Sequence, residues 1–137
     1  MEYQRGRLFD HVQLRVRDLE ASKRFYRAVL ETLEPPIPIV EGQGWFFADE
    51  LFVDIADGPT TRVHLAFQAA SREVVERFHR AALAAGGVDN GLPGERPYHA
   101  GYYAASVLDP DGNNVEAVFH GPSERTAESL VIRPTAG

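Results

Sequence analysis

The sequence predicts an α+β fold of two tandem β-α-β-β-β (βαβββ) modules, which form a curved, mostly antiparallel sheet around a concave site. The first observation behind this is a seven-residue phrase that occurs twice, as RFYRAVL from residue 24 and as RFHRAAL from residue 77, an offset of 53. The second is that His11 and His64 keep the same offset. Two copies of a unit at a fixed offset predict two similar modules packed about a pseudo-two-fold axis.

The length and composition fit one domain in which the two modules share a core. The chain has 137 residues, 44% of them hydrophobic, which is enough to build such a core. We expect a single domain over residues 1–137. Its parts are expected at residues 8–57 for module one, 61–120 for module two and 121–137 for a C-terminal tail, either frayed or lying over a neighbouring surface.

Charge and cysteine content narrow the class of protein. Acidic residues outnumber basic ones 20 to 14, the net charge is −6, and Lys and Arg form no run. We therefore expect no nucleic-acid partner. Cysteine is absent, which excludes disulfides and thiolate ligands and favours a cytoplasmic protein. The chain also lacks the roughly 18 consecutive apolar residues of a membrane span, so we expect no membrane partner.

Module one opens with a predicted strand at residues 9–16, where polar and apolar side chains alternate with the period of a half-buried strand. This alternation turns His11 away from the apolar layer. Asp18 is a suitable N-cap for the helix that follows, and the two prolines at 35–36 end it. Short strands are predicted at residues 37–40, 45–48 and 51–55.

Module two repeats this order. Its first strand is predicted at residues 63–67, and its helix begins after Ser71 as N-cap and closes at the glycines 86–87. Residues 89–103 are rich in Gly and Pro and are expected to form a long functional loop. A hairpin follows, with strands at 104–108 and 114–119 joined by a turn at 109–113.

Three side chains are candidate metal ligands. His11 and His64 are equivalent by the repeat, so they should lie close together across the pseudo-two-fold axis. Glu116 lies between two apolar neighbours; if these face the helices, its carboxylate faces the same side as the histidines. Two neutral imidazoles and one carboxylate can hold a divalent ion and leave positions open for water or substrate. Iron, zinc, nickel and manganese all fit these residue types.

Asp54 is the candidate counterpart of Glu116 in module one, because it is the only acidic residue of its strand away from the ends. It is either a fourth ligand, a substrate contact or a solvated strand residue. Phe47 and Phe52, together with Trp45 and Phe46, are expected to line the concave side and suit an apolar or aromatic substrate, although core packing accounts for them almost equally well.

The segment around residue 100 offers further candidates. His99 or Tyr102 could act as general acid or base, and Tyr103 could contact the substrate; packing of the loop is the alternative for all three. Arg96 could pair with a substrate carboxylate, although exposed arginines are common. His79 is expected on the surface of its helix and His120 at the end of the last strand, and neither receives a role.

The paired modules resemble the vicinal oxygen chelate superfamily, which contains glyoxalase I, bleomycin- and fosfomycin-resistance proteins and extradiol dioxygenases. The resemblance runs over residues 8–119 and rests on three motifs, Asp-His-Val at residues 10–12, Val-His-Leu-Ala-Phe at 63–67 and Asp-Pro-Asp-Gly-Asn-Asn-Val-Glu at 109–116. In that superfamily the metal ligands lie on the first strand of each module and on the last strand. The resemblance therefore implies the same three ligands, His11, His64 and Glu116.

The resemblance implies a metal-dependent enzyme that chelates two adjacent oxygens of a small organic substrate. The bound ion would stabilise an enolate or oxyanion in a lyase, isomerase or dioxygenase step. It also implies a homodimer. The alternative is a non-catalytic protein that sequesters an aromatic or antibiotic-like ligand, as bleomycin-resistance proteins do.

Overall fold

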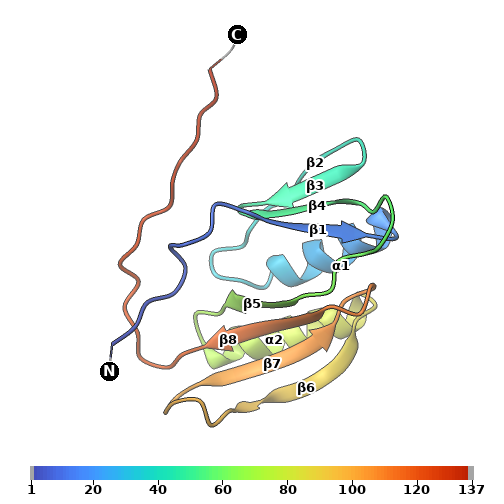
Figure 1. Ribbon diagram of the computed structural model, residues 1–137. Helices are drawn as coiled ribbons and strands as arrows, with labels where there is room; N and C mark the ends of the chain where they lie inside the picture. Colours follow the sequence, from blue (N-terminus) through green and yellow to red (C-terminus); the bar gives the residue numbers. More distant parts are fainter. Residues whose placement is uncertain (1, 136–137) are drawn as a thin grey trace.

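A computed structural model describes residues 2–135 of the chain and shows two modules of the predicted order (Figure 1). Module one contains β1 (Val12–Val16), α1 (Leu19–Leu30), β2 (Val40–Gly42), β3 (Trp45–Ala48) and β4 (Leu51–Ile55). Module two contains β5 (His64–Gln68), α2 (Arg72–Ala84), β6 (Val88–Glu95), β7 (Tyr103–Leu108) and β8 (Asn114–Phe119). The α+β fold class with two βαβββ modules is confirmed.

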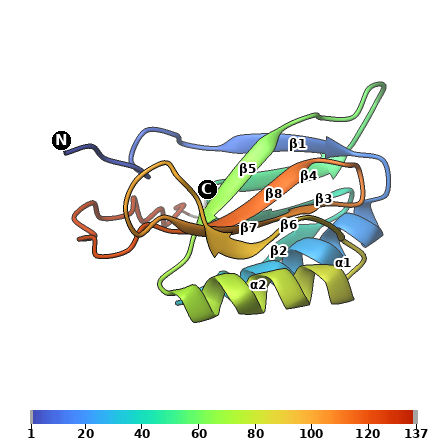
Figure 2. The same ribbon diagram turned by 90° about the horizontal axis from the view of Figure 1, so that it is seen from below.

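Each module has its own four-stranded sheet, in the order β1-β4-β3-β2 and β5-β8-β7-β6. In both sheets the first strand pairs in parallel with the last, and the other two pairings are antiparallel. Both helices lie on one side of the sheets (Figure 2). We call the opposite side of the two sheets the open face. In the part of the chain that the structure describes, no helix has the length and apolar character needed to span a membrane.

The predicted strand alternation determines which side chains reach the open face. In β1, Leu14 and Val16 are fully buried against the helices, whereas Gln13 and Arg15 are exposed. In β8, the neighbours of Glu116 on both sides are fully buried. Because successive side chains of a strand point to opposite sides, the side chain of Glu116 lies on the open face.

Both helices begin at the predicted N-caps. The Asp18 carboxylate accepts a hydrogen bond from the backbone N–H of Ala21 at 3.1 Å, and the Ser71 hydroxyl accepts one from Val74 at 3.2 Å. Each cap satisfies one of the N–H groups that a helix start leaves without an intrahelical partner. The repeat is thus preserved in detail, since the two caps keep the 53-residue offset.

The prediction of a strand at residues 37–40 was wrong, because β2 occupies Val40–Gly42. Pro36 and Pro38 lack the N–H that a sheet requires, so this segment packs Ile37 and Ile39 against the core as an irregular chain instead.

The prediction of a long loop at residues 89–103 was also wrong, because β6 covers Val88–Glu95 and pairs with β7. Its pairing shifts register between Asp89 and Gly91 and again between Gly91 and Gly94. Such bulges let a Gly- and Pro-containing segment remain in a sheet.

The expectation that His79 is a surface residue was wrong as well. It is 6% exposed, and its Nε2 lies 2.8 Å from Oδ1 of Asp89 in β6. This bond joins α2 to the edge strand of its own sheet, and it lowers the pKa of the Asp89 carboxyl.

The C-terminal tail was expected either to fray or to cover a neighbouring surface. Residues 122–135 are exposed and contain no helix or strand, and Figure 1 shows the tail leading away from both modules. Residues 136–137 of the predicted tail, like residue 1, lie outside the described part of the chain.

A buried carboxylate in the turn between β7 and β8 joins the two modules. Oδ2 of Asp109 accepts hydrogen bonds from the hydroxyl of Tyr26 in α1, at 2.6 Å, and from the side-chain amide of Asn113, at 3.0 Å. Oδ1 accepts from the backbone N–H groups of Asp111 and Asn113. Burial, and then the charge of Asp109, raise the pKa of Tyr26 well above its usual range. Tyr26 is therefore held as a proton donor.

Replacing Tyr26 by Phe removes one hydrogen bond to a buried carboxylate without changing the ring. We expect Tyr26→Phe to lower the free energy of unfolding by about 1 to 3 kcal/mol, measured by urea denaturation. Tyr98→Phe, at an exposed ring, is the matched control and should leave the midpoint unchanged. Equal midpoints for parent and Tyr26→Phe would show that the bond does not stabilise the fold.

Candidate functional site

His64 and Glu116 meet on the open face of module two. β5 and β8 pair in parallel, with Ala66 opposite Glu116, which brings the side chain at the start of β5 toward the carboxylate. Nε2 of His64 forms a short hydrogen bond with Oε1 of Glu116. The side chain of His64 is 57% exposed and that of Glu116 is 14% exposed. A basic nitrogen and an anionic oxygen thus converge at a point that solvent can reach.

His11 lies elsewhere on this face. It directly precedes β1, its side chain is 68% exposed, and its Nδ1 is 2.6 Å from Oδ1 of the adjacent Asp10. Within residues 2–135, no group of three His, Cys, Asp or Glu side chains lies close enough to hold one metal ion. The structure therefore brings two of the three predicted ligands together and leaves the third apart.

The strand register identifies the counterpart of Glu116 in module one. Ala66 lies opposite Glu116. Gln13, the equivalent of Ala66 by the 53-residue offset, lies opposite Phe52, so Phe52 is the counterpart of Glu116. Asp54 is two residues further along β4. Both of its carboxylate oxygens accept hydrogen bonds from Gln13, and Nε of Arg15 lies 3.6 Å away. In its position and bonding, Asp54 is not the equivalent of Glu116.

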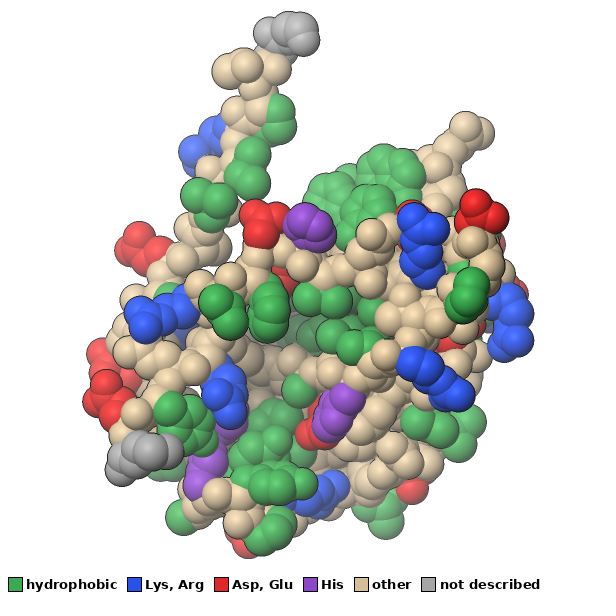
Figure 3. Space-filling model, in the orientation of Figure 1, with side chains coloured by type: hydrophobic (Ala, Val, Ile, Leu, Met, Phe, Trp, Pro, Cys, Tyr) green, Lys and Arg blue, Asp and Glu red, His purple; other side chains and the backbone are tan. Residues whose placement is uncertain are grey.

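Three aromatic rings form a stack on the open face of module one. Trp45 is stacked with Phe47, at a centroid distance of 5.9 Å and an interplanar angle of 11°, and with Phe52, at 6.0 Å and 19°. All three rings are partly exposed. The expectation that Phe46 lines this face was wrong, because Phe46 alternates to the helix side, where it is fully buried beside Tyr26 of α1. Figure 3 shows hydrophobic side chains gathered over module one on this face, with histidines at separate places. The stack offers a flat apolar surface.

His99 and Tyr102 belong to a second aromatic group, at the end of the sheet of module two. The imidazoles of His99 and His120 lie in nearly parallel planes and are joined by a hydrogen bond of 2.9 Å. The ring of Tyr102 meets both imidazoles edge to face. Burial, and then the charge of Glu116, raise the pKa of Tyr102. This group therefore lies within electrostatic range of the Glu116 carboxylate.

The two remaining candidates are held by other contacts. The guanidinium of Arg96 donates to the backbone carbonyls of Leu92, at 2.9 Å, and Glu95, at 3.3 Å. The ring of Tyr103 faces α2, where its hydroxyl donates to Glu76 and Arg72 lies over it. Tyr103 thus lies on the helix side of the sheet, away from the other candidates.

Sequence reasoning assigned no role to His120. The period of a strand was the signal that could have found it, because positions 116, 118 and 120 fall on one face. This period assigns His120 to the open face only once it is known which side chains of β8 point to the helices.

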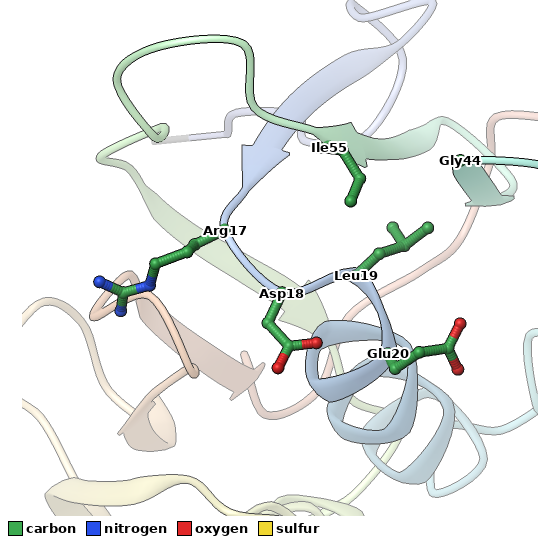
Figure 4. A pocket seen from close by; sticks show the side chains of 6 residues that line it. All are labelled: Arg17, Asp18, Leu19, Glu20, Gly44 and Ile55. Atoms are coloured by element: carbon green, nitrogen blue, oxygen red, sulfur yellow. The ribbon is translucent and has the colours of Figure 1, made fainter.

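A cavity of about 630 Å³ lies on a different part of the molecule, where α1 begins (Figure 4). Its lining contains none of the predicted site residues and consists of Arg17, Asp18, Leu19, Glu20, Gly44 and Ile55. This cavity is therefore separate from the candidate site, whose chemistry rests on the side chains described above.

Comparison with known proteins relates the chain to one family. The sequence profile of the Glyoxalase/Bleomycin resistance protein/Dioxygenase superfamily matches residues 33–117. No curated protein matches the chain significantly.

Many solved structures share the fold. A glyoxalase/bleomycin resistance protein from Albidiferax ferrireducens T118 is 35% identical, with a TM-score of 0.71, over 81% of this chain and 97% of that one. A genomically encoded fosfomycin resistance protein from Listeria monocytogenes is 18% identical, with a TM-score of 0.62, over 84% and 94%. A lactoylglutathione lyase from Agrobacterium tumefaciens is 21% identical, with a TM-score of 0.60, over 84% and 95%. The last two likenesses are likenesses of fold.

Proposed function

This chain belongs to the Glyoxalase/Bleomycin resistance protein/Dioxygenase superfamily, and from that premise we propose that it is a metal-dependent enzyme acting on a small organic substrate with two adjacent oxygens. The proposed ligands are His11, His64 and Glu116. The observation that carries this proposal is the convergence of His64 and Glu116 on the open face. The reaction class is a lyase, isomerase or dioxygenase step.

The donor atoms fit a divalent ion of the first transition series. A neutral imidazole nitrogen and a carboxylate oxygen suit iron, zinc, nickel and manganese alike. They point at each other in the structure, and a hydrogen bond joins them where an ion would join them in the loaded protein. A bound ion would polarise coordinated substrate oxygens and so favour loss of a proton from the neighbouring carbon. The exposure of His64 gives the substrate access.

The third ligand requires either a movement of His11 or a second chain. In one chain His11 is paired with Asp10, and the described residues do not assemble three ligands. We propose that the protein is a homodimer and that His11 of a second copy completes each site. The high exposure of this side chain is what such a contact needs.

The other side chains of the open face would bind and orient the substrate. The stack of Trp45, Phe47 and Phe52 can hold its apolar or aromatic part by ring contact. Asp54 is already paired with Gln13 and Arg15, so it would act by keeping those two side chains in place. Tyr102 stays protonated because its pKa is raised, and it can donate a hydrogen bond.

A second candidate function is favoured by the same aromatic stack. A flat apolar surface binds a planar ligand without a metal, which is what sequestration of an aromatic or antibiotic-like molecule requires. In that case the stack alone would hold the ligand, and the pair of His64 and Glu116 would not be needed for binding.

Metal content tests the first proposal. Protein purified without a histidine tag and incubated with divalent ions should hold about one ion per chain by elemental analysis. His11→Ala, His64→Ala and Glu116→Ala should each weaken binding by more than about a hundredfold, because each removes a direct ligand. Glu124→Ala, which removes an exposed carboxylate of the tail, is the control and should keep the metal. A parent protein that binds no ion would refute the metal site.

Mixed dimers test where His11 comes from. His11→Ala and His64→Ala chains carrying different tags are produced together, and dimers with one of each are isolated. If the ligand is supplied by the second copy, one of the two sites is complete, and the mixed dimer should hold about half the metal of the parent. If His11 serves its own chain, neither site is complete and the mixed dimer will hold none.

Ligand quenching of Trp45, the single tryptophan of the chain, tests the second candidate. Naphthol should quench its fluorescence in metal-free protein, and Phe52→Ala should weaken binding about fivefold to tenfold because one stacking partner is lost. His64→Ala should leave this binding unchanged. Quenching that requires added metal would contradict sequestration by the stack alone.

A further inference from the structure

His120 and His99 form a pair of imidazoles at the end of the open face of module two. His120 directly follows β8, and strand alternation from Glu116 through Val118 brings it to the same face. Tyr102 directly precedes β7, whose first residue pairs with the last residue of β8, and its ring centroid is 5.3 Å from that of His120. The pair therefore borders the surface that carries His64 and Glu116.

The hydrogen bonds of the pair fix the position of each proton. Nδ1 of His99 is 2.9 Å from the carbonyl oxygen of Ala100, and because a carbonyl only accepts, this nitrogen carries hydrogen. In the neutral ring Nε2 of His99 is then bare, so it must accept from Nδ1 of His120 at 2.9 Å. The hydrogen of the neutral His120 ring is used in that bond. Its Nε2 is therefore left with a free lone pair.

Only one atom of the pair can take up a proton without breaking this chain of bonds. A proton added to Nε2 of His120 leaves both hydrogen bonds intact, whereas one added to Nε2 of His99 would remove the acceptor that His120 uses. Burial, followed by the influence of His99 and Arg5, lowers the pKa of His120. The lone pair on its Nε2 is thus available at neutral pH.

The surroundings of the pair suit a ring-shaped ligand with an acidic hydroxyl. Tyr3 meets His99 at a centroid distance of 6.2 Å, and Tyr98 meets Tyr102, which contacts both imidazoles, at 5.0 Å, so further aromatic side chains lie next to the pair. Arg5 lies over Tyr3, and its charge acts on both His120 and Tyr102. A cation close to a base stabilises the anion that is formed when the base removes a proton.

We propose that Nε2 of His120 accepts a proton from a phenol or enol hydroxyl bound at this end of the open face, with His99 as the residue that positions it. The O–H bond breaks, the N–H bond forms on Nε2, and the oxygen keeps the electron pair as an anion. His120 then donates to His99 as an imidazolium. This inference rests on the proposed function only in treating the open face as the ligand-binding surface.

Nitrogen NMR of the imidazoles tests the assignment of the protons. In free protein at neutral pH, Nε2 of both His99 and His120 should show the shift of a bare ring nitrogen, and both Nδ1 atoms that of a protonated one. A protonated Nε2 on His120 in the neutral ring would overturn the proposal. This measurement does not depend on any metal or activity.

The colour of para-nitrophenol tests proton acceptance, because this phenol turns yellow when it loses its proton. At a pH just below the pKa of the free phenol, binding to the parent protein should raise the yellow fraction. His120→Asn keeps a donor in place of Nδ1 but lacks the base, so it should abolish the rise and weaken binding about tenfold. His99→Gln keeps an acceptor for His120 and should behave like the parent, whereas His99→Phe should behave like His120→Asn.

Two results would overturn the proposal. One is a parent protein that neither binds nor ionises the phenol; the other is a His120→Asn variant that ionises it as the parent does. His64→Ala should lose metal and still ionise the phenol. A protein that holds no metal but passes both tests would therefore refute the proposed function and leave this inference standing.

Discussion

The buried carboxylate of Asp109 is the constraint from which the geometry of the open face follows. Through Tyr26 it fixes module one against module two, and through Asn113 it fixes the turn from which β8 begins. The side-chain oxygen of Asn113 in turn accepts the backbone N–H of Val63, just before β5. The strands that carry His64 and Glu116 therefore start from one hydrogen-bonded unit, and their meeting point is set by the backbone as much as by their own contact.

Periodic features of the sequence predicted most of the fold. The 53-residue repeat gave both modules, and the residue patterns gave β3, β4 and β8 with their observed ends and both N-caps. Predictions failed where a side-chain contact or a β-bulge produced a structure that the local composition does not favour. Glycines and a proline predicted a loop at β6, but register shifts keep this segment in the sheet. His79 was expected on the surface, but it is buried by its contact with Asp89 in β6. Such contacts form between separate elements, and no pattern within one element encodes them.

The candidate site was predictable to the level of faces and no further. The alternation of side chains along a strand predicted Glu116 and His64 on one side of the sheet, and a hydrogen bond joins them there. This alternation says nothing of the distance between two sheets that share no strand pairing among the described residues, so it did not reveal that His11 lies apart from that pair within one chain. The metal site stays a prediction. For Tyr103 the sequence left substrate contact and packing open, and the structure turns its ring to α2, where its hydroxyl donates to Glu76. Cytoplasmic location and the absence of a nucleic-acid partner likewise stay predictions.

The replacement of a carboxylate by a ring at one repeat position has a consequence for how a ligand lies. The backbone relates Phe52 to Glu116 by pseudo-two-fold symmetry, but their side chains share no chemistry. A symmetric surface would accept a ligand in either of two directions with equal free energy. Here one half offers an anion and the other a stack of rings, so a ligand that spans both modules has one preferred direction, with its polar end toward Glu116. The duplicated fold can therefore bind a ligand in one orientation because its two halves carry different side chains.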